Sequence, residues 1–403
     1  MLVNILLYSQ EVIKGLRSNP CLYDNLFITD SYKSPLSIPF LDDFSGDNFI
    51  ANNSLWQKSS VFINRSYPVN PPTLGVATFD GLNDKGLAYL IDVSNPYGSA
   101  DTLLSKPIDL SNINVAYLMF YYQPQGIGDN PQVEDSLILE FRDLNGNWNV
   151  IWKKPGDYMY EFKRKIIMLD NVNYLYNNFQ FRFRNKSTLS GNFDHWHIDY
   201  IKIDEYNTSS DTNNLDDVAF VYSSPSFLKR YNEMPWSHFL NNEIFELSDT
   251  IDILIRNNNA STNIDYQYNV FENNSQIAHY PTLGVSRNAT VLDYNTIGNF
   301  SFTSPPISVS SSVFNSIIPD SLTFIIQHII GTGQSDFKEN DTLYRKQDFF
   351  SHFSYDDGVA ESAYGINTDG AKIAYQFKLN RPDTLRAVEM YFPQMLDTVN
   401  NVN

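Results

Sequence analysis

From Phe40 onward the chain alternates between short apolar runs and breaks rich in Asn, Gly, Pro and Asp. Residues 115–122 are apolar or aromatic throughout, which predicts a buried strand. Residues 179–184 alternate strictly between aromatic and polar side chains, which predicts a strand with one buried and one solvated face. Residues 143–147 form a turn-rich break between two such runs, which predicts a hairpin. Because no segment keeps a helical period, the pattern predicts an all-β protein.

The spacing of the apolar runs divides the chain into units. A stretch rich in Ser, Thr, Asn and Asp at residues 207–217 predicts a linker. The hairpin spacing after it favours an immunoglobulin-like fold. We therefore expect a lead-in at residues 10–37, a jelly-roll sandwich at 38–206, an immunoglobulin-like sandwich at 218–345 and the start of a further β domain at 348–403.

A weak internal repeat predicts how the last unit begins. Phe353–Gly358 echoes Phe40–Ser45, since both place paired aspartates beside an aromatic residue. Strands are predicted at residues 371–377 and 387–392, and too few residues follow to close a two-sheet sandwich. We expect the natural protein to continue past Asn403 through the rest of that unit to a sorting domain.

Composition narrows the class of protein. The 403 residues carry 28 Lys and Arg against 46 Asp and Glu, a formal net charge of −18, with no block of basic residues. A nucleic-acid partner is therefore not expected. The aromatic content of 15% fits β-sheets, on whose pleated faces aromatic rings pack well. The single cysteine, Cys21, argues against a disulfide framework and favours a bacterial exported protein.

The first residues carry an export signature. Residues 2–8 are apolar and Ser9-Gln10 follows as a small-residue cleavage site, so residues 1–9 are interpreted as the remnant of a signal peptide. A buried first strand is the alternative interpretation. No later stretch is long and apolar enough to span a bilayer, so we expect an exported protein without a transmembrane segment.

Four segments carry a resemblance to a known group of proteins: Phe40–Phe44, Pro71–Gly81, Ala100–Ile108 and Trp196–Ile203. With them the chain resembles the secreted and surface proteins of Bacteroidota that the type IX secretion system exports. Its first unit is similar to MAM and laminin-G-like jelly rolls, although the disulfides of animal MAM domains are missing. The resemblance implies a place outside the cell or on the outer membrane face, with the type IX machinery as a partner. It names no ligand, because such sandwiches host many functions.

Three aspartates are candidate ligands of a structural cation. Asp42 and Asp43 stand at the start of the jelly roll, and Asp199 lies on its closing strand. The first and last strands of a jelly roll are often neighbours, so these carboxylates can meet, and Ca²⁺ prefers oxygen ligands. The resemblance implies the same, since related jelly rolls hold a structural cation near this place. The alternative is that the aspartates cap loop amides.

Other polar residues have both a chemical and a structural interpretation. His195, His197 and Asp199 occupy alternate positions of one predicted strand, an arrangement that zinc can use. Because no further nitrogen or sulfur ligand is nearby, buried and hydrogen-bonded histidines are favoured. The acidic residues at 134–135 and Glu140 could form the acid pair of a glycosidase, but solvated strand faces explain them better. No sequence motif of a nucleophilic hydrolase, metalloprotease or phosphate loop occurs.

Tryptophan side chains are candidates for a sugar-stacking platform. Trp148 and Trp152 have the same parity on one predicted strand, so they are expected to face the same side. The alternative is that most of these rings belong to the core. The tryptophans are Trp56, Trp148, Trp152, Trp196 and Trp236.

The tripeptide Asp-Ser/Thr-apolar recurs along the chain. Exported Bacteroidota proteins are O-glycosylated at tripeptides of this kind, so the resemblance implies glycans at exposed strand entrances. The local alternative is that Asp and Ser or Thr end a turn and the apolar residue starts a strand. The candidate acceptors are Thr102, Ser136, Thr250, Ser321, Thr342 and Thr384.

These observations favour a non-catalytic secreted or surface protein of the type IX pathway. Its role would be adhesion, glycan binding or a structural part of a surface assembly, with a glycan or a surface protein as partner. The alternatives are an accessory binding region of a secreted hydrolase and a dedicated partner of the secretion or gliding machinery.

Overall fold

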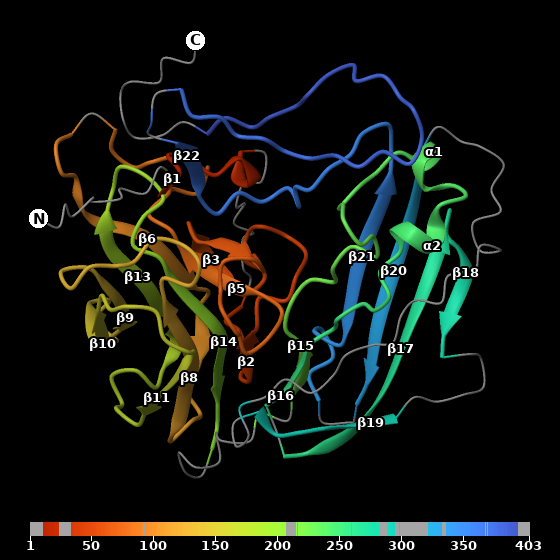
Figure 1. The fold of residues 1–403 in the computed structure, drawn as a ribbon. Coiled ribbons are helices and arrows are strands. Elements are labelled where there is room, and N and C mark those ends of the chain that lie inside the picture. Colours follow the sequence, from red (N-terminus) through yellow and green to blue (C-terminus); the bar gives the residue numbers. More distant parts are fainter. Residues whose placement is uncertain are drawn as a thin grey trace, which may run out of the picture.

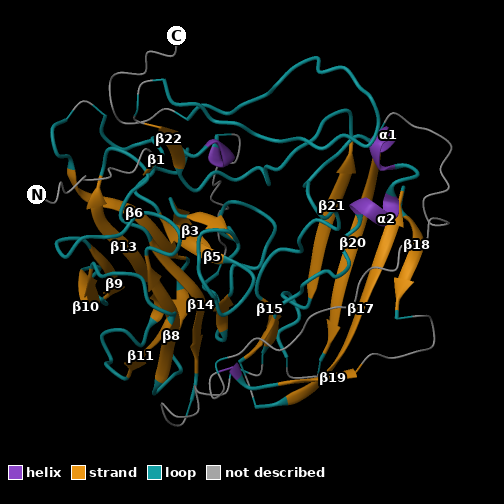
Figure 2. Ribbon diagram, viewed as in Figure 1, coloured by secondary structure: helices purple, strands orange, loops and turns teal. Residues whose placement is uncertain are grey.

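The computed structural model describes residues 11–23, 34–91, 93–206, 215, 217–258, 260–281, 288–294, 298, 321–332, 336–366, 368 and 370–393. It confirms the predicted all-β class: two sandwich units lie side by side, and the described helices are single turns (Figures 1 and 2). The predicted signal-peptide remnant at residues 1–9 lies outside the described residues.

The first unit is a sandwich of two antiparallel sheets. Its strands are β2 (Phe40–Asp42), β3 (Trp56–Ser59), β4 (Phe62–Asn64), β5 (Val76–Phe79), β6 (Tyr97–Ser105), β7 (Ile108–Asp109), β8 (Ala116–Pro124), β9 (Ser136–Arg142), β10 (Trp148–Pro155), β11 (Lys163–Leu169), β12 (Asn177–Phe179), β13 (Phe181–Thr188) and β14 (Trp196–Asp204). The five-stranded sheet has the order β10-β9-β13-β6-β3, and the six-stranded sheet has β11-β8-β14-β5-β4 with β2 beside β14. The pairing of β2 with β14 confirms that the first and last strands of this unit are neighbours.

Alternating side chains fill the space between the two sheets, as the pattern at residues 179–184 predicts. Phe181 and Phe183 of β13 are fully buried, whereas Arg182 and Arg184 lie on the other face of the strand. Phe120 of β8 meets Phe183 edge to face, with ring centroids 4.8 Å apart. Burial of each such ring stabilises the fold by about 1.5–3 kcal/mol, so the aromatic residues hold the two sheets together.

The second unit packs one large sheet against a smaller ribbon. Its elements are β15 (Val218–Phe220), α1 (Trp236–Phe239), α2 (Glu243–Glu246), β16 (Ile255–Asn257), β17 (Thr262–Glu272), β18 (Ser275–Tyr280), β19 (Asn288–Val291), β20 (Leu322–Gly331) and β21 (Thr342–Phe349). The large sheet has the order β18-β17-β20-β21, with β19 also on β17, and the ribbon is β15-β16. Side chains of the large sheet and of the ribbon contribute to one apolar cluster, in which the ring centroids of Trp236 and Phe349 lie 5.3 Å apart.

The described residues differ from the predicted start of a third unit in two respects. Asp348 and Phe349 belong to β21, so the second unit runs past the predicted boundary. Residues 371–377 and 387–392 have no strand partner within the described part of the chain, so the predicted strands are not formed there. The repeat at Phe353–Gly358 is not structural either, since it lies in a loop whereas Phe40 starts a strand.

The final described residues form a strap over both units instead. Residues 370–393 run extended across one side of the molecule (Figure 1). The strap is fixed to the second unit where the Lys378 backbone N–H donates to the Tyr231 hydroxyl, 2.8 Å. Before the strap, β22 (Ala363–Ile366) pairs with β1 (Glu11–Lys14), and the lead-in continues through the single 3₁₀ turn Pro20–Leu22. The lead-in and the strap therefore connect the ends of the described chain to both units.

Polar and apolar contacts join the two units. The Asn70 backbone N–H donates to the Tyr222 hydroxyl (2.8 Å), and the Asn258 amide donates to the Pro72 carbonyl (3.1 Å). Leu74, on a loop of the first unit, is 1% exposed and belongs to the apolar cluster of the second. The loop can approach so closely because Gly75 follows, whose missing β-carbon would lie 1.9 Å from the Phe44 carbonyl oxygen.

Candidate functional site

The predicted ligands Asp42, Asp43 and Asp199 are all buried. Asp42 accepts hydrogen bonds from the Trp56 indole (2.5 Å) and the Phe44 backbone N–H (3.0 Å), and burial raises the pKa of its carboxyl to about 7. Among the described residues, no group of three or more His, Cys, Asp or Glu side chains is arranged to hold a metal ion. Asp43 and Asp199 lie together around Thr73, whereas the Asp42 carboxylate pairs with the Trp56 indole, and the calcium ion itself stays a prediction.

Asp43 and Asp199 belong to a buried polar cluster between the two units. Thr73 Oγ1 lies 3.1 Å from the Asp43 carbonyl oxygen and 3.1 Å from the Asp199 carboxylate. Asn340 of the second unit donates to Asp43 (3.0 Å) and to Asp217 (3.1 Å). Burial and then the Asp43 charge raise the pKa of Asp199 and of Asp217 well above the usual range. Asp217 is therefore part of the contact between units, not of a solvated linker.

The histidines are structural, as favoured from the sequence. His197 contacts the Thr78 hydroxyl (2.8 Å) and the Gln125 carbonyl (3.1 Å), and His195 accepts from the Asp129 backbone N–H (2.7 Å) and contacts Asn192. Burial lowers the pKa of His195 to about 3 and that of His197 to about 4. All four ring nitrogens have protein partners, so these neutral rings offer zinc no free ligand atom.

The tryptophans do not form one platform. Trp56, Trp196 and Trp236 are buried core residues. A β-bulge between Val150 and Trp152 shifts the register of β10, so that Trp148 is opposite Arg142 whereas Trp152 is opposite Leu139. The bulge sends the two rings to opposite faces of the sheet. The predicted shared face of Trp148 and Trp152 is therefore wrong: Trp152 packs on Phe120 inside the sandwich.

Within the described part of the chain, Glu140 pairs with two arginines and not with a second acid. Its carboxylate pairs with Arg182 (2.6 Å) and Arg184 (2.7 Å) on the outer face of the five-stranded sheet. Although burial raises the pKa of Glu140, the hydrogen bonds from Arg184 and Arg182 hold it below its usual value. This carboxylate is consequently ionised and held in place by two cations, which is the reverse of what a general acid needs.

The candidate glycosylation sites differ in exposure. Ser321 and Thr342 lie at or next to the starts of β20 and β21, and Thr250, Ser321 and Thr384 are exposed. The expectation for Ser136 is wrong, because it is fully buried at the start of β9. Thr102 is half-buried within β6. A glycan is thus sterically accommodated at Thr250, Ser321 and Thr384, and whether any site is modified stays a prediction.

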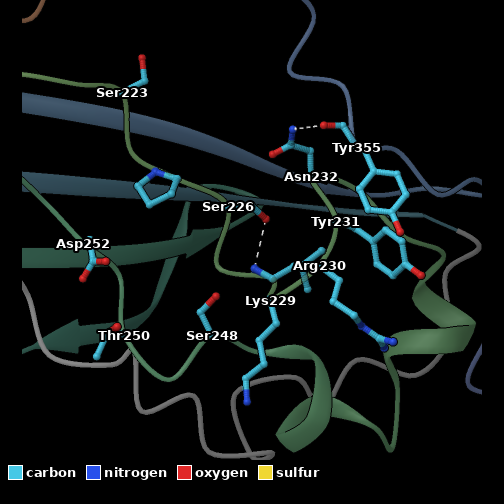
Figure 3. A pocket seen from close by; sticks show the side chains of 12 residues that line it. Ser223, Ser226, Lys229, Arg230, Tyr231, Asn232, Ser248, Thr250, Asp252 and Tyr355 are labelled. Atoms are coloured by element: carbon cyan, nitrogen blue, oxygen red, sulfur yellow. Dashed lines mark hydrogen bonds between the residues drawn. The ribbon is translucent and has the colours of Figure 1, made fainter. Parts of the chain in front are cut away.

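An open cleft of about 530 Å³ lies on the second unit and is the candidate binding site (Figure 3). Two loops form it, one after β15 and one after α2, and Tyr355 closes one end. Its lining residues are Ser223, Pro225, Ser226, Leu228, Lys229, Arg230, Tyr231, Asn232, Ser248, Thr250, Asp252 and Tyr355. The volume is within the range of ligand sites, about 300–1,000 Å³.

Hydrogen bonds hold the shape of the cleft. Ser226 donates to Gln347 (2.8 Å), and the Asn232 amide donates to the Tyr355 carbonyl (2.9 Å; Figure 3). The rings of Tyr231 and Tyr355 lie 4.9 Å apart. Tyr231 is buried, whereas Tyr355 is 37% exposed at the cleft end, and the Tyr355 ring also contacts the rings of Tyr375 and Phe377 on the strap. The cleft is thus a fixed surface with one accessible aromatic ring.

The charges of the cleft are largely compensated. Lys229 pairs with Asp249 (2.9 Å), and Arg230 pairs with the buried Glu246. Asp252 adds an exposed carboxylate. The remaining polar lining consists of hydroxyl groups and an amide. Sequence reasoning missed this cleft, because its loops hold no motif and Tyr355 lies more than a hundred residues from Ser248.

Comparisons with known proteins identify no family. No protein-family model matches the chain, and no curated protein matches it. Solved structures include a family 16 carbohydrate-binding module, at 11% identity over 39% of this chain and 100% of that one, with a TM-score of 0.24. The K1 cleaved adhesin domain of Lys-gingipain from Porphyromonas gingivalis matches at 13% identity over 49% and 99%, TM-score 0.25. A xylan-binding domain from Paenibacillus barcinonensis matches at 9% over 43% and 96%, TM-score 0.23.

At these identities and TM-scores the similarity carries no argument about what this chain binds. Among the described residues, no helix has the length and apolar character needed to cross a membrane.

Proposed function

We propose that the chain is a non-catalytic surface protein that binds a neutral glycan in the cleft of its second unit. The observation that carries the proposal is the cleft lining: hydroxyl and amide groups surround an open groove, with the accessible ring of Tyr355 at one end. Sugars combine hydroxyl groups with apolar ring faces, so they match such a surface. Because Lys229 and Arg230 are paired with acids, neither cation of the described lining is left to select for an acidic ligand.

Export by the type IX pathway is the second part of the proposal. It is supported by the apolar residues 2–8 and by the sequence resemblance to Bacteroidota surface proteins. In intact cells of the source organism, antibody labelling of the surface should detect the protein, and inactivation of the type IX machinery should abolish the signal. Unchanged labelling in that mutant would reject the pathway and leave the glycan site untouched.

A glycan array probed with the whole chain, followed by titration calorimetry, tests binding. Tyr355→Ala should weaken the dissociation constant of a neutral glycan by about tenfold, because it removes the aromatic ring at the cleft end. Tyr158→Ala is the matched control, since Tyr158 is 80% exposed on the first unit. Equal affinity of both variants, or no array signal from the wild-type chain, contradicts the proposal. Shortened sugars after incubation would refute its non-catalytic part.

A further inference from the structure

The outer face of the five-stranded sheet gathers positive charge. Residues opposite one another in antiparallel strands lie on one face. The register across β10, β9, β13, β6 and β3 therefore places Val150, Glu140, Arg182, Leu104 and Lys58 in one outward row. Neighbouring rows contribute further basic side chains. The cationic members are Lys58, Arg142, Lys153, Arg182, Arg184 and Lys186.

This face has the opposite sign from the protein as a whole. The chain has a net charge of −18, yet the described outward positions carry six cationic side chains and one acidic side chain, Glu140. The reversal comes largely from β13, where Phe-Arg-Phe-Arg-Asn-Lys sends every second residue outward. A surface with one sign of charge attracts ligands of the other sign and increases their local concentration.

The arginines of this face are already fixed in position. Arg182 and Arg184 each donate to Glu140, at 2.6 and 2.7 Å, and the Arg182 guanidinium lies 4.2 Å from the ring centroid of Trp148. A guanidinium has five N–H donors, so each arginine keeps donors for a second carboxylate. Because Glu140 neutralises one of the two charges, the pair retains one net positive charge.

The lysines of this face are available to a ligand. Among the described residues, no ion pair involves Lys58, Lys153 or Lys186, and Lys58 and Lys153 are exposed. The second unit packs against the other sheet, where Arg256 lies 5.8 Å from the ring of Tyr121 on β8. Figure 1 shows the labels of β10, β9 and β13 on the side away from that unit.

We propose that this sheet face binds an acidic polysaccharide that carries carboxylate groups. Five strands span about 19 Å at roughly 4.8 Å per strand, which suits an extended polymer better than a small ligand. The arginines and lysines pair with its carboxylates, and Trp148 at the sheet edge supplies an aromatic ring. The inference goes beyond the proposed function, because the face lies on the other unit and selects the other class of glycan.

Nucleic acid fits this face less well. A DNA duplex carries one negative charge per about 1.7 Å, so the net charge of −18 repels it more strongly than it repels a polymer with one charge per sugar. Single strands are usually held by bases stacked on successive aromatic rings, whereas the described outward positions carry Trp148 and Tyr97 at opposite ends of the face, not a row of rings. A polyuronate has one charge per sugar and matches the spaced cations better.

Affinity electrophoresis and calorimetry with polygalacturonate test the inference. The wild-type chain should bind at low salt and lose affinity as salt rises, because exposed charges are screened. The triple variant Lys58→Gln, Lys153→Gln, Lys186→Gln should bind about tenfold or more weakly. Since none of these lysines has an ion-pair partner among the described residues, the variant should keep the wild-type melting temperature.

A matched control separates this face from general charge effects. Lys85→Gln, Lys165→Gln, Lys346→Gln removes the same charge elsewhere and should bind polygalacturonate like wild type. No wild-type binding, equal weakening in both triple variants, or tighter binding of a thymidine oligonucleotide than of polygalacturonate overturns the inference. Tyr355→Ala should not alter polygalacturonate binding. A negative result for the cleft can therefore be distinguished from a negative result for the sheet face.

Discussion

Leu74 connects the two units, and its truncation to alanine tests how they are joined. The side chain comes from a loop of the first unit, is 1% exposed and lies in the apolar cluster of the second unit. If the cluster depends on this contribution, Leu74→Ala should destabilise the second unit although the mutation lies in the first.

The expected magnitude follows from the burial of the side chain. Truncating a buried leucine costs about 2–5 kcal/mol, depending on how far the surrounding residues relax into the cavity. Gly75 places the loop against Phe44, so the backbone has little room to move into the cavity. A loss of about 3 kcal/mol corresponds to a decrease of roughly 6–12 °C in the melting temperature for a unit of this size.

Hydrogen exchange monitored by mass spectrometry, with calorimetry, is the suitable assay. In Leu74→Ala the amides of β17 and β20 should exchange faster, because their sheet loses packing. Leu103→Ala is the matched control: Leu103 is fully buried in the core of the first unit, so faster exchange should appear at β6 and β13. A Leu74→Ala protein with unchanged exchange in β17 and β20 would refute the shared cluster.

Three further predictions concern ionisation, calcium and modification. Burial raises the pKa of Asp42 from 3.8 to about 7. The contribution of this carboxyl to stability is therefore complete below about pH 4 and is lost as pH rises through 7. The free energy of unfolding should be lower at pH 8 than at pH 5, and a higher value at pH 8 would contradict this. The calcium prediction requires that chelation lowers the melting temperature of the first unit and that added Ca²⁺ restores it, while an unchanged temperature rejects it. Peptide mapping of native protein should find O-glycans at Ser321 and Thr384, which are exposed and lie outside the cleft, and unmodified peptides at both positions would reject the modification.

Alternation along single strands was predictable from the sequence. The pattern at residues 179–184 indicates which side chains of β13 are buried, and the Phe residues there are in the core. Alternation fails where the register changes, because the bulge at Ile151 reverses the side of Trp152 and leaves no trace in the hydrophobic pattern. The cationic face likewise depends on which strands become neighbours, since β13 lies between β9 and β6.

Long-range contacts account for what the sequence could not predict. Asn340 meets Asp43 across 297 positions, so neither residue by itself indicates the buried cluster between the units. The apolar alternation at residues 371–377 does predict a strand, but a strand also needs a neighbouring backbone, and the described residues supply none. The cleft was not predictable either, because it is lined by loops that lie far apart in the sequence.

A neutral glycan bound in the cleft should leave a hydrogen-exchange footprint on the two loops that line it. The measurement compares the whole chain alone with the chain saturated by a neutral glycan that the array identifies. Exchange should slow at residues 223–232 and 248–252 and around Tyr355, with the first unit unchanged. Protection confined to the first unit, or no protection at a saturating glycan concentration, would contradict it.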